Sequence, residues 1–143
     1  MDLDRFADAQ RRDFDQAFAE IEAGRKRSHW IWYVLPQIDG LGSSPTARRY
    51  AITSVAEARA FLADPLLGGN YRRMVAAILA RVRAGQSLGD VFGWPDDVKT
   101  VSSLTLFAGA SAPDDPLVAD VDEILTTDGR SPCAPTRAFL AAG

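Results

Sequence analysis

Apolar residues recur three or four positions apart along most of this 143-residue chain. That spacing is typical of amphipathic α-helices, whereas half-buried strands alternate apolar and polar residues. The clearest case is residues 1–24, where Phe6, Phe14, Phe18 and Ile21 fall on one helical face. No segment shows the alternation of a strand, so the sequence predicts an all-α fold.

Prolines, glycines and capping residues divide this pattern into helical segments. Ser54 and Glu57 form a capping-box pattern before one helix. Gly24 and Gly85 follow two long apolar stripes, where glycine commonly ends a helix. We therefore expect an orthogonal bundle of about six to eight helices, three of them long. The expected helices are residues 1–24, 54–63, 66–84, 87–92, 95–110, 114–127 and 135–142, with a helical turn at 46–50.

The size and composition indicate one soluble domain, residues 1–143, large enough to fold without a disulfide or a structural metal. The net charge of -3 argues against a general nucleic-acid binder. A single cysteine, Cys133, excludes an internal disulfide and a cysteine-based zinc site. No apolar run approaches about 20 residues and no signal peptide is visible. We therefore expect a cytoplasmic protein that uses no membrane, metal or cofactor.

The segment 24–37, GRKRSHWIWYVLPQ, is the most informative stretch of the chain. It holds the only histidine, two of the three tryptophans and three cationic side chains. Its aromatic run is typical of a buried strand or a buried short helix, which periodicity cannot distinguish over so few residues. Ser28 as a cap and Pro36 as a stop favour the short helix.

Two interpretations of this segment remain open. Aromatic residues bury large areas, so the segment can serve to anchor the core. Alternatively it lines a cleft, in which His29 acts as an acid or a base. In that case Gln37 orients a polar ligand and Lys26 supplies positive charge at the rim. Trp30 or Trp94 offers a stacking face.

A second candidate cluster lies on the expected helix 95–110. Asp96, Lys99 and Ser103 stand at i, i+3 and i+7 and so share a helical face. The ordinary interpretation is a surface ion pair between Asp96 and Lys99. Ser103 and its neighbour Ser102 would then bond back to the preceding turn. The alternative is that Lys99 and the two serines face the aromatic segment and bind an anionic group.

The loop 38–45, IDGLGSSP, is rich in glycine and serine and leads into a turn that carries Arg48 and Arg49. Backbone amides of such a loop can hold a phosphate, and Ser44 is its candidate ligand-binding side chain. The loop lacks the lysine of a Walker motif and the third glycine of a dinucleotide fingerprint. A plain turn is the alternative.

In this order, these segments resemble domain-of-unknown-function family 1810. The matching motifs are R-F-x-x-A-Q at residues 5–10, G-x-K-x-S-H-W-x-W-Y-x-x-P-Q at 24–37, G-L-G-x-S at 40–44 and D-x-K-x-x-S-S-x-T-L-F at 97–107. The resemblance spans residues 3–110 and fades over the C-terminal helices at 111–143. Leu35 departs from it, because phenylalanine is the more familiar residue there. The resemblance implies a small, mostly helical, mainly bacterial protein and no particular activity.

Two functions fit these observations. The first is binding or processing of a small anionic molecule in a pocket between the aromatic segment and the helix that carries Lys99. A general likeness to small helical proteins that process ADP-ribose suggests a nucleotide or an ADP-ribose-like ligand. The candidate catalytic residues are His29 and Lys99, and the candidate ligand-binding residues are Lys26, Trp30, Gln37, Ser44, Ser102 and Ser103. The second function is a non-catalytic protein-interaction module, with the chain a monomer or a homodimer. A contiguous exposed apolar patch would favour the module.

Overall fold

The structure is a computed structural model that describes residues 2–143. These residues contain nine α-helices. These residues contain no strand apart from one isolated bridge between Ile38 and Ile52, so the predicted all-α fold is confirmed. The helices are α1 (Asp4–Glu22), α2 (Ile31–Val34), α3 (Pro45–Arg49), α4 (Val55–Ala63), α5 (Pro65–Arg83), α6 (Leu88–Phe92), α7 (Asp96–Ala110), α8 (Pro116–Thr127) and α9 (Ala134–Ala142). Their number exceeds the expected range because the turn at 46–50 is itself a helix, α3. Of the helices within residues 2–143, none is both long enough and apolar enough to cross a membrane.

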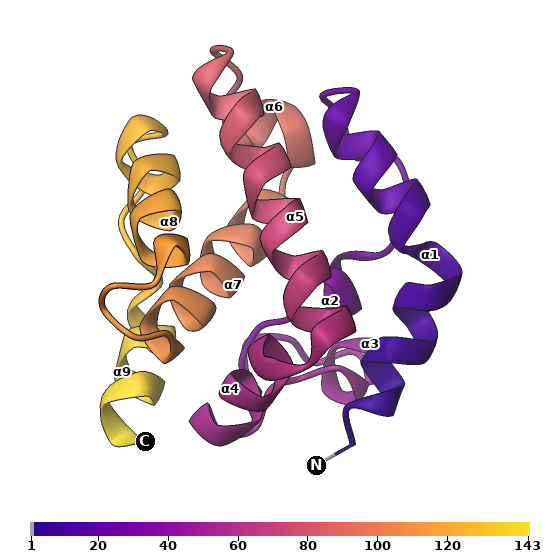
Figure 1. Ribbon diagram of the computed structural model, residues 1–143, viewed down its shortest axis with the longest axis vertical. Helices are drawn as coiled ribbons and strands as arrows, with labels where there is room; N and C mark the ends of the chain where they lie inside the picture. The colour runs from indigo at the N-terminus through magenta and orange to yellow at the C-terminus, as the bar shows by residue number, and fades with distance from the viewer. Residues whose placement is uncertain (1) are drawn as a thin grey trace.

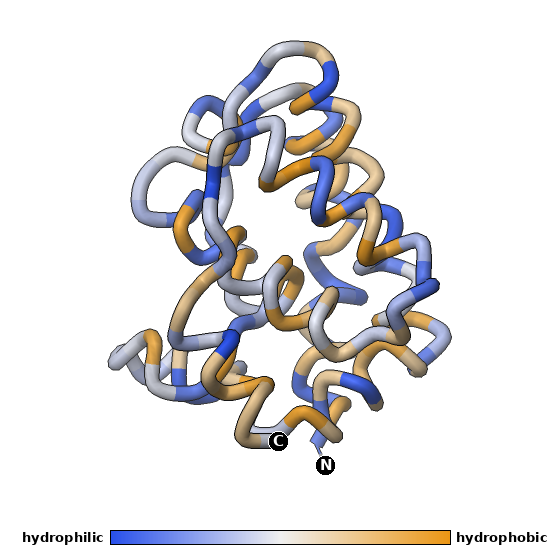
Figure 2. The backbone as a smooth tube through the Cα atoms, turned by 90° about the vertical axis from the view of Figure 1, so that its left-hand side faces the viewer, coloured by the Kyte–Doolittle hydropathy of each residue, from blue (hydrophilic) through white to orange (hydrophobic). Residues whose placement is uncertain are grey.

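The helix α5 runs through the middle of the fold (Figure 1). α1 packs along one side of α5 and α8 along the other, and α7 crosses behind and contacts α4, α6, α8 and α9. The alternation of hydrophobic and hydrophilic positions along the helices can be followed in Figure 2. The buried stripe of α5 follows the predicted helical spacing closely and includes Leu67, Tyr71, Met74, Val75, Ile78, Leu79 and Val82.

The side-chain cap predicted at the start of α4 is present, whereas the one predicted at the start of α2 is not. The Ser54 hydroxyl accepts a hydrogen bond from Glu57 N at 3.0 Å. The glycines expected to end α1 and α5 lie in the left-handed region, with φ of 90° and 98°. The cap predicted at Ser28 is wrong, because α2 begins only at Ile31 and the Ser28 hydroxyl bonds to Glu20 instead. That bond attaches the aromatic segment to α1.

The backbones of α4 and α5 approach each other closely where α4 turns into α5. Asp64 ends α4 and caps α5, and its carboxylate accepts hydrogen bonds from the N–H groups of Leu66 and Leu67 at 2.9 Å. One residue later, Gly68 lies against the Leu62 carbonyl. A Cβ at position 68 would stand 2.0 Å from that carbonyl oxygen. Space, rather than a backbone angle, therefore requires glycine here.

Candidate functional site

A buried carboxylate on α1, Glu20, holds the aromatic segment in place. Its Oε1 accepts hydrogen bonds from the backbone N–H groups of Arg27 and Ser28 at 2.8 and 3.0 Å. The same oxygen accepts a hydrogen bond from the Trp30 indole N–H at 2.9 Å. The Ser28 hydroxyl and the Gln16 amide bind the other oxygen. Trp30 is therefore held inside the core, where it is 1% exposed.

These hydrogen bonds determine the ionisation of Glu20. Burial disfavours the charged form, but the bonds from the Ser28 hydroxyl, the Arg27 N–H, the Trp30 N–H and the Ser28 N–H together outweigh burial. They lower the pKa of Glu20 from 4.5 to about 2. Sequence reasoning missed this residue, because an acidic position in an amphipathic helix ordinarily faces solvent.

Two lysines share one carboxylate at the start of α7. Asp96 lies 2.7 Å from Lys26 Nζ and 3.4 Å from Lys99 Nζ, so the ion pair considered for Asp96 and Lys99 is present. The side chain of Lys26 is 5% exposed, whereas that of Lys99 is 26% exposed. Lys99 Nζ also lies 5.0 Å from the centre of the Trp32 ring. Because one negative charge serves two positive charges, the cluster keeps an excess positive charge, and Lys99 is its accessible member.

A cavity of about 400 Å³, here called the Lys99 cavity, opens beside this cluster. Its walls come from the chain after α2, the turn before α7, one face of α7 and the start of α9. Three of the candidate residues, Gln37, Lys99 and Ser102, meet here. The rest of the wall is apolar except for one thiol, and consists of Leu41, Trp94, Pro95, Val98, Cys133 and Pro135.

The Lys99 cavity gathers the large apolar side chains that the fold leaves uncovered. Within residues 2–143, these are Leu41, Trp94 and Val98, which are 37%, 84% and 49% exposed. All three line this one cavity. The apolar spacing of residues 95–110 predicts a buried position for Val98, but Val98 borders the cavity and is 49% exposed. An apolar surface beside a cation and an amide is typical of a small-molecule site.

The thiol of Cys133 lies in the wall of the Lys99 cavity. Its sulfur is 3.4 Å from the Ser102 hydroxyl and 3.1 Å from the Thr136 hydroxyl. Burial by itself raises the pKa of a thiol. The two hydroxyls and the Thr136 N–H outweigh burial and hold the pKa of Cys133 below its ordinary value. The Cys133 N–H donates to Thr105 Oγ at 3.0 Å, which fixes this segment against α7.

His29 lies apart from the Lys99 cavity. It is exposed and borders a separate cavity of about 110 Å³ between α1 and α2, which Asp13, Gln16 and Tyr33 also line. The structure therefore does not bring His29 and Lys99 together in one cavity.

The remaining candidate residues take structural positions. Ser103 is fully buried, and its hydroxyl lies 2.9 Å from the Tyr71 hydroxyl. It therefore does not share the accessible face of Lys99. Ser44 caps α3, where its hydroxyl accepts a hydrogen bond from Ala47 N at 3.1 Å. This geometry is that of the plain turn, the alternative to a phosphate-binding loop.

The model of a family described as protein of unknown function (DUF1810) matches residues 1–131. The chain belongs to this family. This DUF1810 chain is also similar to the conserved hypothetical protein Rv1873 from Mycobacterium tuberculosis, whose crystal structure has 41% sequence identity and a TM-score of 0.89. That similarity covers 98% of this chain and 96% of the mycobacterial one. A search of curated proteins found no significant match.

Two residues that line the Lys99 cavity were not among the candidate site residues predicted from the sequence. Leu41 lies in the G-L-G-x-S motif and Cys133 outside the motifs, and the place of both in the cavity depends on which other segments reach it. The sequence offers Trp94 as an alternative to Trp30 for the stacking face, and of the two only Trp94 is exposed. Its exposure nevertheless depends on the tertiary fold.

Proposed function

We propose that this DUF1810 protein binds a small organic anion with a flat apolar part in the Lys99 cavity. The observation that carries the proposal is the position of the exposed apolar side chains. Leu41, Trp94 and Val98 border a single cavity, which also contains an ammonium and an amide. Ligand pockets commonly combine apolar walls with a few polar groups, and about 400 Å³ is within their usual range of volume.

Different walls of the cavity suit different parts of such a ligand. The Trp94 ring is largely exposed and offers a face on which a planar group can stack. Lys99 supplies the positive charge, and Gln37 supplies an amide that can both donate and accept hydrogen bonds. Of the ligands suggested from the sequence, a nucleotide whose phosphate is a singly charged diester belongs to this class, whereas an ADP-ribose-like compound carries two phosphate charges.

The charges around Lys99 favour an anionic group with a single negative charge. Asp96 is already held by Lys26, so an anion that approaches Lys99 meets one positive charge in excess. Free N–H groups at a helix N-terminus could add to this attraction. In α7, however, the three N–H groups that follow Asp96 already donate to the carbonyls of Gly93 and Pro95, at 2.9 to 3.3 Å. A carboxylate or a phosphodiester therefore suits the site better than a doubly charged phosphate monoester.

The proposal concerns binding and does not include a reaction. Of the two candidate catalytic residues, Lys99 borders the cavity and His29 borders another. An acid–base pair made of these two side chains would need them within hydrogen-bond reach of one substrate. The geometry supports Lys99 as a charge partner for the ligand.

Isothermal titration calorimetry with indole-3-acetate and its neutral analogue indole-3-acetamide tests the proposal. We expect the wild-type protein to prefer the acetate. Lys99→Met should weaken acetate binding about fivefold to tenfold, because an ion pair of this exposure contributes about 1 kcal/mol. Acetamide binding should not change in this variant. Trp94→Ala should weaken both ligands, because both lose the same stacking surface.

Arg83→Met provides the matched control. Arg83 pairs with Glu123 on the surface, away from the residues that line the Lys99 cavity, so the variant removes one positive charge without touching the site. Equal weakening in Arg83→Met and Lys99→Met would show that net charge alone matters. That result, or flat titrations with indole-3-acetate, 1-naphthoate and cyclic AMP, a singly charged phosphodiester, would contradict the proposal.

A second candidate function is a protein-interaction module, including a homodimer. The specific observation in its favour is that Trp94 is 84% exposed beside two other apolar side chains. Large aromatic residues of this kind commonly anchor protein interfaces. A homodimer through this surface would appear as concentration-dependent sedimentation that Trp94→Glu abolishes. A sedimentation coefficient independent of concentration would rule out the homodimer.

A further inference from the structure

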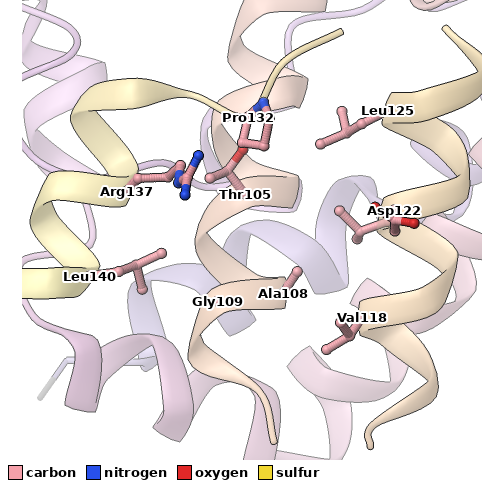
Figure 3. A pocket seen from close by; sticks show the side chains of 10 residues that line it. Thr105, Ala108, Gly109, Val118, Asp122, Leu125, Pro132, Arg137 and Leu140 are labelled. Carbon is pink, nitrogen blue, oxygen red and sulfur yellow. The ribbon is translucent and has the colours of Figure 1, made fainter. Parts of the chain in front are cut away.

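A second cavity, of about 260 Å³, lies between α7, α8 and α9 (Figure 3). Its wall is mainly apolar and includes Val118, Val121, Leu125, Pro132 and Leu140. We call it the α8–α9 cavity. It shares no lining residue with the Lys99 cavity, so its function can be argued separately.

The α8–α9 cavity occupies the side of α9 that faces α8. α9 packs against α7, and Thr136 is the one residue of α9 that is fully buried. Gly109 permits this close contact, because a Cβ at that position would stand 2.3 Å from Leu140 Cδ1. Toward α8, by contrast, the cavity separates Leu140 from Val118 and Leu125 (Figure 3). An apolar ligand in this space would supply packing that α9 lacks on that side.

Arg137 gives this apolar cavity a positive charge. It lies in α9, and Figure 3 shows its guanidinium near Thr105 and Pro132. None of the ion pairs within residues 2–143 involves Arg137. Asp122 is the acidic residue of the cavity and belongs to the opposite wall, on α8. Its negative charge disfavours a ligand with a second anionic group.

We infer that the α8–α9 cavity binds a medium-chain aliphatic monocarboxylate. Its carboxylate lies at Arg137, and its chain lies between α8 and α9. A guanidinium matches a carboxylate in charge and in geometry. A dry apolar cavity of roughly 150 Å³ holds a molecule as large as benzene. A cavity of about 260 Å³ therefore has room for a chain of about six to eight carbons.

Calorimetric titration with octanoate and its neutral analogue octanamide tests this inference. The wild-type protein is expected to bind octanoate about tenfold more tightly than octanamide. Arg137→Gln should remove that preference by weakening octanoate alone. Ala108→Leu, which adds bulk to the α7 wall, should weaken both ligands at least tenfold. Hydrogen exchange of the wild-type protein adds a readout that needs no variant, since octanoate should slow exchange in residues 134–142.

Two controls separate this site from other surfaces. Arg48→Gln removes a positive charge from α3 and should leave octanoate binding unchanged. Lys99→Met alters the other cavity and should also leave it unchanged, so the two proposals can fail separately. The inference is overturned if the wild-type protein does not bind octanoate at millimolar concentration. It is also overturned if Lys99→Met abolishes octanoate binding, or if exchange in residues 134–142 is unaffected by octanoate.

Discussion

Gly68→Ala is expected to destabilise the protein by about 3 kcal/mol or more, although alanine is the better helix former. The new Cβ would stand 2.0 Å from the Leu62 carbonyl oxygen and 2.8 Å from the carbonyl carbon. These are backbone atoms at the end of α4, so no side-chain rotation relieves the overlap. The Asp64 cap and the buried side chains of Phe61 and Leu67 hold the two helices together on both sides of this contact.

Gly69→Ala is the matched control, because Gly69 is the next residue of the same helix. A Cβ at position 69 meets nothing within 4 Å, and the position is exposed. Alanine there should stabilise the protein by up to about 1 kcal/mol, through helix propensity alone. Urea denaturation measures both variants. Equal stabilities for Gly68→Ala and Gly69→Ala would contradict the close approach of α4 and α5.

Glu20→Ala is the second change with a large expected effect, a loss of about 3 to 5 kcal/mol. The substitution leaves the N–H groups of Arg27 and Ser28 and the Trp30 indole N–H without their acceptor. The Trp30 donor is buried and the two backbone donors are partly buried. A buried donor without a partner costs about 1 to 3 kcal/mol, a partly buried one costs less, and such costs are not fully additive. Glu22→Ala, an exposed change on the same helix, should stay within about 0.5 kcal/mol of the wild type.

The same carboxylate predicts a pH dependence of stability. Because the pKa of Glu20 is lowered from 4.5 to about 2 on folding, its stabilising contribution is fully present above about pH 4.5. The contribution is lost as the pH falls from about 4.5 toward 2, and its size is on the order of 3 kcal/mol. Denaturation of Glu20→Gln should show a correspondingly weaker pH dependence in this window. An unchanged acid profile in Glu20→Gln would contradict the assigned network.

The helices could be predicted from the sequence because their signals are local. The apolar stripes of α1 and α5 repeat over five turns, and prolines, glycines and Ser54 mark several helix ends. The start of α2 could not be predicted in the same way. Ser28 is suited to capping, but its hydroxyl has a stronger acceptor in Glu20, which lies on another helix. The preference of a single residue was overridden by a tertiary contact.

The candidate site was predictable in part. Gln37, Lys99 and Ser102 share a cavity, but residues 29–33 do not line it, so the expected pocket between the aromatic segment and α7 stays a prediction. His29 and Ser103 lie elsewhere. Helical spacing predicts which residues of one helix share a face, but it does not predict which neighbouring element that face contacts. For the same reason the sequence could not show that the apolar rim of the cavity would remain uncovered.

The most direct test of the Lys99 cavity as a ligand site is a titration of the ¹⁵N-labelled protein with indole-3-acetate, followed by NMR at the tryptophan indole N–H groups. Trp94→Phe assigns the signal of Trp94, which is 84% exposed, while Trp30 is 1% exposed and bonded to Glu20. The account predicts that the Trp94 signal shifts saturably and that the Trp30 signal does not move. A Trp94 signal that stays fixed up to millimolar indole-3-acetate would contradict it.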